Sequence, residues 1–190
     1  VKNSHRFVPE EECMKIFNEV EKVSSSIEKV LVIANAKLEE VKCINNRSTP
    51  PSVIQLHGNE SVDYCRELKN EFPGIKIWKA FRLKAINDLE NISQYEKNID
   101  AILIDAWDDK SLGGTGNRVP IELLLNTTFK APWILAGGIS AEIIPKIFSK
   151  LILFYVAFLF TVFNFQSTFY EAIITFTNSM YIIIRTCFYN

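Results

Sequence analysis

Cysteine, excess charge and an apolar leader are all scarce or missing in this 190-residue sequence. The four cysteines lie far apart and form no C-x-x-C pair, which argues against a zinc site or a disulfide framework and favours reduced thiols. With a net charge of -1, the chain has no excess of basic residues that would attract nucleic acid or an anionic membrane surface. The first residues contain neither an initiator methionine nor an apolar stretch, so we expect no secretory signal. These absences predict a cytoplasmic protein without a nucleic-acid partner.

Residues 151–190 contain no glycine and no proline, and only Glu171 and Arg185 among them are charged. The uncharged run LILFYVAFLFTVFNFQSTFY has the length of a membrane-spanning helix, which needs about 20 apolar residues. Its polar residues near Asn164 and the lack of flanking basic clusters argue against a span. Three interpretations stay open: translated noncoding sequence, a membrane anchor, or a buried terminal element. We therefore separate a domain over 1–150 from an apolar tail over 151–190.

Residues 1–150 alternate between strand and helix patterns. Short β-branched runs predict strands, and amphipathic runs between them predict single helices. The predicted strands are 28–35, 52–58, 75–81, 100–105 and 132–138. The predicted helices are 9–23, 36–44, 60–72, 85–97, 120–126 and 140–150. This order predicts an α/β fold with a parallel sheet. It does not distinguish an open doubly wound sheet from a (β/α)8 barrel, although Gly137-Gly138 directly after WILA favours the barrel. Five strands cannot close an eight-stranded barrel, so about three are missing or disguised.

Three polar residues stand at the carboxyl ends of predicted strands, where both architectures place their ligand sites. Asp105 follows a dry apolar run, so burial could raise its pKa for proton transfer; alternatively, it caps the next loop. His57 is either a catalytic group or a satisfied structural histidine. Lys79 either points into the site, where Asp105 or a substrate would be its anionic partner, or lies on the surface.

Glycine is concentrated beside these strand ends. Three of the seven glycines lie in GGTG, where Gly113, Gly114, Thr115 and Gly116 fit a loop closing over a site, a nest of N–H groups for an anion, or a long turn. Arg6 could bind a carboxylate through two parallel hydrogen bonds, although a surface arginine is the alternative. No G-x-G-x-x-G or P-loop pattern is present.

The motifs SHRFV, VIQLHGNES, IKIWKA, ILIDA followed by GGTG, and WILAGGIS occur in the order and spacing of one family. Over residues 3–150 the chain resembles phosphoribosylanthranilate isomerase, a (β/α)8 TIM barrel of tryptophan biosynthesis. The resemblance implies a partial barrel of about five β/α units. It also implies the Amadori rearrangement of N-(5'-phosphoribosyl)anthranilate, a small phosphosugar, without cofactor or metal.

The resemblance also implies roles for individual residues. Asp105 would be the general acid that protonates the furanose ring oxygen, and the GGTG loop would fold over the substrate. Arg6 would hold the anthranilate carboxylate, and the backbone N–H groups of Gly137, Gly138 and Ile139 would bind the phosphate. His57 and Lys79 match family positions near the substrate.

The sequence departs from the family at both ends. The general base of the family is a cysteine in K-x-C-G, and this motif is absent, as is the phosphate-loop motif D-x-S-S-G. We expect that the first two strands and the last strand of the barrel are missing and that activity is impaired. The alternatives are a non-catalytic, membrane-tethered remnant that serves as an interaction protein, and a different phosphosugar-binding barrel such as an epimerase.

Overall fold

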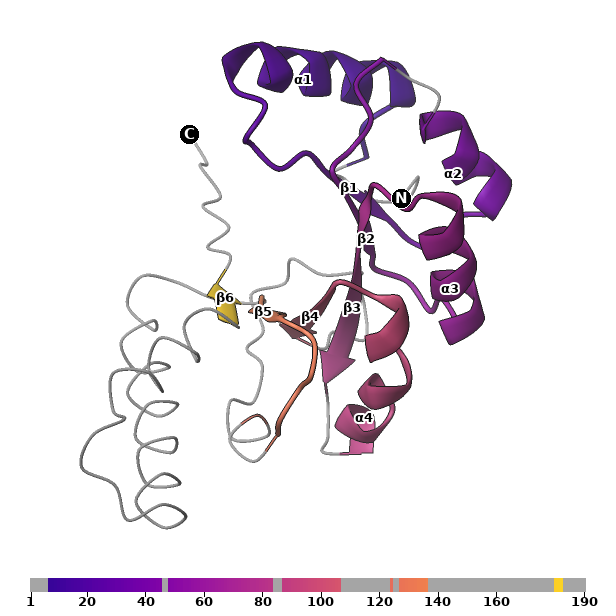
Figure 1. The fold of residues 1–190 in the computed structure, drawn as a ribbon, viewed down its shortest axis with the longest axis vertical. Coiled ribbons are helices and arrows are strands. Elements are labelled where there is room, and N and C mark those ends of the chain that lie inside the picture. Colours follow the sequence, from indigo (N-terminus) through magenta and orange to yellow (C-terminus); the bar gives the residue numbers. More distant parts are fainter. Residues whose placement is uncertain are drawn as a thin grey trace, which may run out of the picture. The chain divides into compact units, whose positions relative to one another are not determined.

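The structure is a computed structural model that describes residues 7–45, 48–83, 87–106, 124, 127–136 and 180–182. The chain forms two compact units, each described here by itself. The first unit comprises Val1–Ala80 and Gln94–Ile102, and the second comprises Phe81–Ser93 and Leu103–Asn190. Figure 1 shows the elements and their labels.

Parallel strands alternate with helices in the first unit, as the sequence predicts. The elements in chain order are α1 (Glu10–Val23), β1 (Val30–Ile33), α2 (Leu38–Asn45), β2 (Val53–Leu56), α3 (Val62–Glu71), β3 (Lys76–Leu83) as far as Ala80, and the first residues of β4 (Ala101–Ala106). β1 pairs with β2 and β2 with β3, both in parallel, so that Val53 lies between Val30 and Lys76. Figure 1 shows α2 and α3 on the same side of β1 and β2.

Local signals explain where the helices of this unit begin and end. Pro9 precedes α1, and three glutamates fill the first turn, where negative charge complements the helix dipole. The Ser61 hydroxyl accepts a hydrogen bond from the Tyr64 N–H at 3.1 Å and so caps α3. α3 ends at Glu71, just before Phe72 and the Pro73-Gly74 pair. The predicted helices over 9–23, 36–44 and 60–72 are thus confirmed to within a few residues.

The single helix predicted over 85–97 is wrong. The described part contains one α-helical turn, α4 (Asn87–Glu90), and two 3-10 turns, η1 (Ile92–Gln94) and η2 (Glu96–Asn98). The Ser93 hydroxyl donates to the Glu90 carbonyl at 3.2 Å. Asn and Ser side chains compete with helical backbone bonds in this way, so Asn91 and Ser93 favour turns over a continuous helix.

The second unit contains the end of β4 together with β5 (Trp133–Leu135) and β6 (Met180–Ile182). The Ala136 N–H donates to the Ile104 carbonyl at 2.7 Å, and β5 pairs in parallel with β6. β6 lies inside the apolar 151–190 tail, the rest of which is outside the described residues. In the described part of the chain, no helix has the length and apolar character needed to cross a bilayer.

The core of the first unit is centred on β2, whose four residues are all buried. Ile54 and Leu56 are almost fully buried together with Leu68 of α3 and Ile77 of β3. A continuous buried run of this kind is typical of a parallel strand covered on both faces. Gln55 is the polar exception within it.

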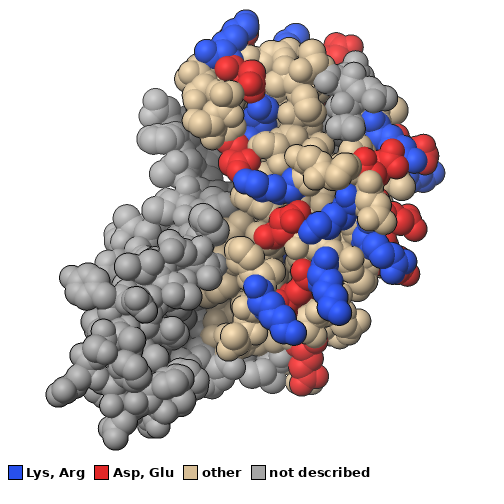
Figure 2. All heavy atoms as spheres, in the orientation of Figure 1, with Lys and Arg blue, Asp and Glu red and all other residues tan. Residues whose placement is uncertain are grey.

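Charged side chains on the helices form exposed pairs rather than a patch of one sign. Figure 2 shows lysine and arginine beside aspartate and glutamate over the face in view. Lys15–Glu12, Lys22–Glu19 and Arg66–Asp63 are pairs one helical turn apart. Exposed pairs of this kind contribute only about 0–1 kcal/mol each, so they contribute little to the stability of the fold.

Ion pairs and hydrogen bonds join the amino ends of the strands. Glu28, just before β1, pairs with Lys76 at the start of β3 and accepts from the Ser52 hydroxyl at 2.6 Å. Asp100, just before β4, accepts from Lys69 at 2.9 Å and from the Ile77 N–H at 2.8 Å. In barrel folds this edge serves stability, whereas the opposite, carboxyl edge carries the ligand site.

Glu28 should make the stability of the protein depend on pH. The hydrogen bond from Lys76, followed by that from Ser52, lowers the pKa of Glu28 below its ordinary value. A lowered folded-state pKa adds stability above the unfolded pKa, and this stability is lost as pH falls through the folded pKa. We expect Glu28→Gln to lower the urea midpoint at pH 7 and to lower it by less at about pH 3. Glu19→Gln, at an exposed pair, is the control; an equal loss at both pH values would contradict the assignment.

Candidate active site

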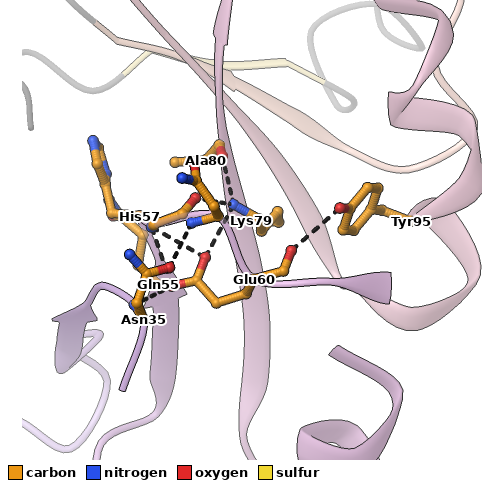
Figure 3. A network of polar contacts seen from close by, with 9 residues as sticks. Asn35, Gln55, His57, Glu60, Lys79, Ala80 and Tyr95 are labelled. Atoms are coloured by element: carbon orange, nitrogen blue, oxygen red, sulfur yellow. Dashed lines mark hydrogen bonds and ion pairs between the residues drawn. The ribbon is translucent and has the colours of Figure 1, made fainter. Parts of the chain in front are cut away.

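The turns after β1 and β2 and the middle of β3 meet around one buried carboxylate, that of Glu60. Its Oε1 accepts from the Asn35 N–H at 2.8 Å, and both oxygens accept from the Gly58 N–H at 3.1 and 3.0 Å. The Tyr95 hydroxyl donates to the Glu60 carbonyl oxygen at 3.2 Å. Figure 3 shows Asn35, Lys79 and Tyr95 around Glu60. Glu60 therefore joins its own turn after β2 to the turn after β1 and to Tyr95, which directly precedes η2.

Lys79 of β3 is the cation of this cluster. Its Nζ lies 3.1 Å from Glu60 Oε2, and the two side chains are 4% and 2% exposed. The ammonium also donates to the carbonyl oxygens of Gly58 and Ala80, each at 2.9 Å. Three acceptors match the three N–H groups of an ammonium, as a buried charge requires. The anionic partner of Lys79 is thus Glu60. The sequence analysis had suggested Asp105 or a substrate instead.

Strand register places Lys79 and His57 on opposite faces. Lys79 pairs with Leu56, so its side chain lies on the face of Leu56. Gln55 and His57 alternate with Leu56 and therefore lie on the other face. The His57 N–H donates to the Ile33 carbonyl at 2.8 Å, which extends the β1–β2 ladder by one residue.

The His57 imidazole is buried, with Nδ1 2.9 Å from the Gln55 amide nitrogen. An amide NH2 group can only donate, so in this geometry Nδ1 is the acceptor. This contact ties the His57 ring to Gln55, two residues earlier on the same face of the strand.

Gly58 lies where no larger residue fits. A Cβ at this position would come within 2.5 Å of the Asn35 Oδ1 and 2.7 Å of the Asn35 backbone nitrogen. Asn35 has a φ of 52°, in the left-handed region, and its Oδ1 accepts from the Asn59 N–H at 2.7 Å. Asn tolerates this region better than most residues because its side chain bonds locally. The close approach of two turns therefore explains the glycine of the QLHG motif.

We expect Gly58→Ala to destabilise the protein by about 1–3 kcal/mol, because the new methyl group overlaps backbone as well as side-chain atoms. Thermal unfolding would show this as a midpoint lowered by about 2–4 °C per kcal/mol. Gly74→Ala is the matched control, since nothing lies within 4 Å of the added Cβ. Equal midpoints for the two variants would contradict this prediction, because they would show that the turn at Asn35 can move aside without a loss of folding free energy.

Asp105 lies at the carboxyl end of β4, in the second unit. It follows the buried residues Ile102, Leu103 and Ile104 and is itself only 4% exposed. The structure thus places Asp105 in the dry strand-end setting that the sequence predicts.

Comparison with known families adds the decisive observation. The sequence model of the family described as N-(5'-phosphoribosyl)anthranilate (PRA) isomerase matches residues 1–156. The chain belongs to the phosphoribosylanthranilate isomerase family. The resemblance noted in the sequence is therefore confirmed.

Phosphoribosylanthranilate isomerases of cyanobacteria are among the relatives. The chain is 36% identical to that of Trichodesmium erythraeum over 154 residues, which are 80% of this chain and 65% of the relative. It is 34% identical to that of Crocosphaera subtropica over 142 residues, 75% of this chain and 66% of the relative. The chain thus spans slightly less than two thirds of the length of these relatives.

Solved structures of phosphoribosylanthranilate isomerase share the fold. Monomers of the dimeric enzyme from Thermotoga maritima match with a TM-score of 0.58 at 23% identity, covering 80% of this chain and 68% of theirs. A complex with reduced 1-(o-carboxyphenylamino)-1-deoxyribulose 5-phosphate matches with a TM-score of 0.59 at 22% identity, covering 79% of this chain and 67% of its own. The α/β fold of this chain is therefore a partial (β/α)8 barrel, as predicted.

Several residues predicted from the family motifs lie outside the described part of the structure. These are Arg6, the GGTG loop of Gly113, Gly114, Thr115 and Gly116, and the phosphate-binding group of Gly137, Gly138 and Ile139. Their roles stay predictions. Asp105, His57 and Lys79 are described; Lys79 contacts Glu60 and the carbonyl of Gly58, the residue that follows His57 in the chain.

The sequence analysis missed Glu60, Asn35 and Gln55. Glu60 stands directly before the helix cap Ser61. An acidic residue beside a helix N-terminus is ordinarily interpreted as a solvated group that complements the helix dipole. The available signal was indirect: an inward-facing lysine on the next strand needs a carboxylate, and Glu60 follows the preceding strand by four residues.

The described cysteines do not have the character of the family's general base. Burial raises the pKa of Cys65 in α3 to about 11, and burial followed by Glu10 raises the pKa of Cys13 in α1. Both thiols are therefore protonated at neutral pH, whereas a base must be a thiolate. Cys43 in α2 is exposed, and Cys187 lies outside the described residues. In the part that the structure describes, no group of three or more His, Cys, Asp or Glu residues could hold a metal ion.

Proposed function

We propose that this chain carries the substrate site and the general acid of a phosphoribosylanthranilate isomerase. The observation that carries the proposal is a buried aspartate, Asp105, at the carboxyl end of β4, within the family match over residues 1–156. The reaction is the Amadori rearrangement of N-(5'-phosphoribosyl)anthranilate to 1-(2-carboxyphenylamino)-1-deoxyribulose 5-phosphate, in tryptophan biosynthesis.

The acid step requires a proton donor in a dry setting. Asp105 gives its proton to the furanose ring oxygen, the C1'–oxygen bond breaks, and the nitrogen lone pair forms a C1'=N Schiff base. A base then removes the C2' proton to give an enolamine, which tautomerises to the C2' ketone. The proposal assigns the acid step to Asp105 and assigns the base step to no described residue, because K-x-C-G is absent from the sequence.

Substrate recognition is assigned to the residues that the family motifs identify. A phosphosugar carrying a carboxylate needs donors, and the proposal gives Arg6 the carboxylate and the N–H groups of Gly137, Gly138 and Ile139 the phosphate. His57, which directly follows β2, is a further substrate-binding residue in the proposal. The complex of the solved isomerase with a reduced aminoketose phosphate supports a ligand of this class.

The proposal also includes the domain division and the location. The catalytic domain comprises residues 1–150, a boundary supported by the family match that ends at residue 156. Residues 151–190 form the apolar tail. A cytoplasmic location is supported by free thiols on Cys13, Cys43 and Cys65.

The test is consumption of phosphoribosylanthranilate by two proteins. One is the full chain, and the other is a hybrid in which the matched residues of this chain replace their counterparts in the Trichodesmium relative. The hybrid is expected to turn over substrate, and the full chain is expected to be slower by about a hundredfold or more, because loss of a general base costs about that much. A hybrid that is folded but inactive would contradict the proposal.

A further inference from the structure

β1 stands at an edge of the sheet in the first unit. The strand order there is β1-β2-β3, so β2 is the one neighbour of β1 among the described residues. All four residues of β2 are buried, whereas each residue of β1 is partly exposed, and Val32 is 39% exposed. β1 is therefore an apolar edge strand that the described residues cover only in part.

The backbone of β1 directs alternate residues away from β2. The carbonyl groups of Lys29 and Ile33 accept hydrogen bonds, at 3.2 and 2.8 Å, from N–H groups at the start of β2 and just after its end. In a parallel ladder every second residue directs both its N–H and its C=O toward the same neighbour, so Leu31 also faces β2. The N–H and C=O groups of Val30 and Val32 therefore lie along the outer edge.

This edge carries no charge that would keep another strand away. Exposed edge strands are ordinarily protected by a charged residue or a proline, but the sequence of β1 is VLVI. The two charged residues that precede it form ion pairs within the chain, Glu28 with Lys76 and Lys29 with Glu21. The outer edge of β1 is therefore apolar and neutral, and it favours an apolar strand as its partner.

A second copy of β1 meets these requirements in one register. In an antiparallel pair centred on Leu31, the two Leu31 residues lie opposite each other, and Val30 lies opposite Val32 of the second copy. Val30 and Val32 then exchange both of their backbone hydrogen bonds, as opposed residues of an antiparallel ladder do. Lys29 lies opposite Ile33, whereas a parallel, in-register pair would place the two Lys29 residues side by side. Charge therefore favours the antiparallel arrangement.

We propose that the outer edge of β1 is an interaction surface for a second copy of this chain, and that two copies pair through antiparallel β1 strands centred on Leu31. The interface is isologous, because the same residues of each copy form it. Two four-residue strands bury little surface, so the dimer belongs to the weak class that forms and dissociates with concentration. The surface lies within the first unit, and its formation requires no substrate.

Disulfide cross-linking of the full chain tests the register. Opposed residues of a non-hydrogen-bonded antiparallel pair have Cα atoms about 4.5 Å apart, within the range of about 4.4–6.8 Å that a disulfide spans. We expect Leu31→Cys to give a covalent dimer under mild oxidation. Val30→Cys should give none, because the two copies of this residue are offset by two positions, roughly 7 Å along the strand. Both substitutions are made in a Cys43→Ser chain, since Cys43 is exposed, and that chain without a new cysteine is the control.

Sedimentation over a wide range of concentrations tests whether the same edge forms the dimer without a cross-link. We expect the unsubstituted chain to be a mixture of monomer and dimer. Val32→Lys should weaken dimerisation by about tenfold, because a lysine then lies at the edge of each copy. Ile16→Lys is the matched control: Ile16 is also an exposed apolar residue, 47% exposed, but it lies on α1, so association should be unchanged.

Three results would overturn the proposal. The first is a folded chain that stays monomeric at every concentration and gives no covalent dimer with Leu31→Cys. The second is equal cross-linking by Leu31→Cys and Val30→Cys, which would exclude the antiparallel register. The third is association that a folded Val32→Lys variant leaves unchanged, which would place the contact elsewhere. The cross-links decide the register even if Val32→Lys does not fold, and since neither measurement involves substrate, the outcome is independent of the proposed function.

Discussion

Replacement of Lys79 by methionine is expected to lower the free energy of unfolding by about 3–5 kcal/mol. The substitution leaves the Glu60 carboxylate, 2% exposed, without its cation, while methionine fills a similar volume. Native domains of this size are stable by only about 5–15 kcal/mol, so the loss would be a large fraction of the total. Urea unfolding followed by circular dichroism measures it directly.

Two companion variants separate the unpaired charge from a packing defect. Lys22→Met removes a lysine that pairs with Glu19 at 2.6 Å with both side chains 70% exposed, and it should cost no more than about 1 kcal/mol. Adding Glu60→Gln to Lys79→Met should recover part of the loss, because the buried charge is then gone. A single variant that loses less than about 1 kcal/mol would show that Glu60 is hydrated or protonated without Lys79.

Replacement of Asp105 by asparagine is expected to lower kcat of the hybrid isomerase by about 10²–10⁴-fold, the usual contribution of a positioned general acid. Asparagine has nearly the same shape but cannot give up a proton to the ring oxygen. Because the substitution removes a transition-state interaction, KM should change little by comparison. Steady-state consumption of phosphoribosylanthranilate, with stability measured in parallel, tests both parts.

Asp100→Asn is the matched control for this variant. Asp100 stands at the other end of the same strand, where it accepts from Lys69 at 2.9 Å and from the Ile77 N–H at 2.8 Å. Its substitution should lower stability and leave kcat within a fewfold of the parent. Equal losses of kcat in both variants would mean that Asp105 acts through the fold rather than through its proton.

Much of the fold was predictable because strands and helices alternate with clear local signals. Pro9, Ser61 and the Pro73-Gly74 pair mark helix ends that the structure confirms. The prediction was wrong over 85–97, where apolar periodicity suggested one helix but the side chains of Asn91 and Ser93 favour turns. Local hydrogen bonding decided this segment, and hydrophobic spacing alone does not report it.

The candidate site was predictable only in part. Asp105 and His57 stand at strand ends, and this position can be deduced from one segment at a time. Glu60 could not be assigned in that way, because its partners Asn35 and Lys79 come from other strands, 25 and 19 residues away in the sequence. Which lysine meets which carboxylate depends on sheet register and on the face of each strand, both of which arise only in the folded chain.

The most direct test of the central claim is to map where the ligand binds the full chain. Backbone amide shifts would be followed while reduced 1-(o-carboxyphenylamino)-1-deoxyribulose 5-phosphate is added. If the carboxyl end of β4 belongs to the substrate site, saturable shifts should appear at Asp105 and be absent at Lys29, Ile77 and Asp100, which lie at the amino ends of strands. Shifts confined to the amino edge, or none in a folded chain, would contradict the claim.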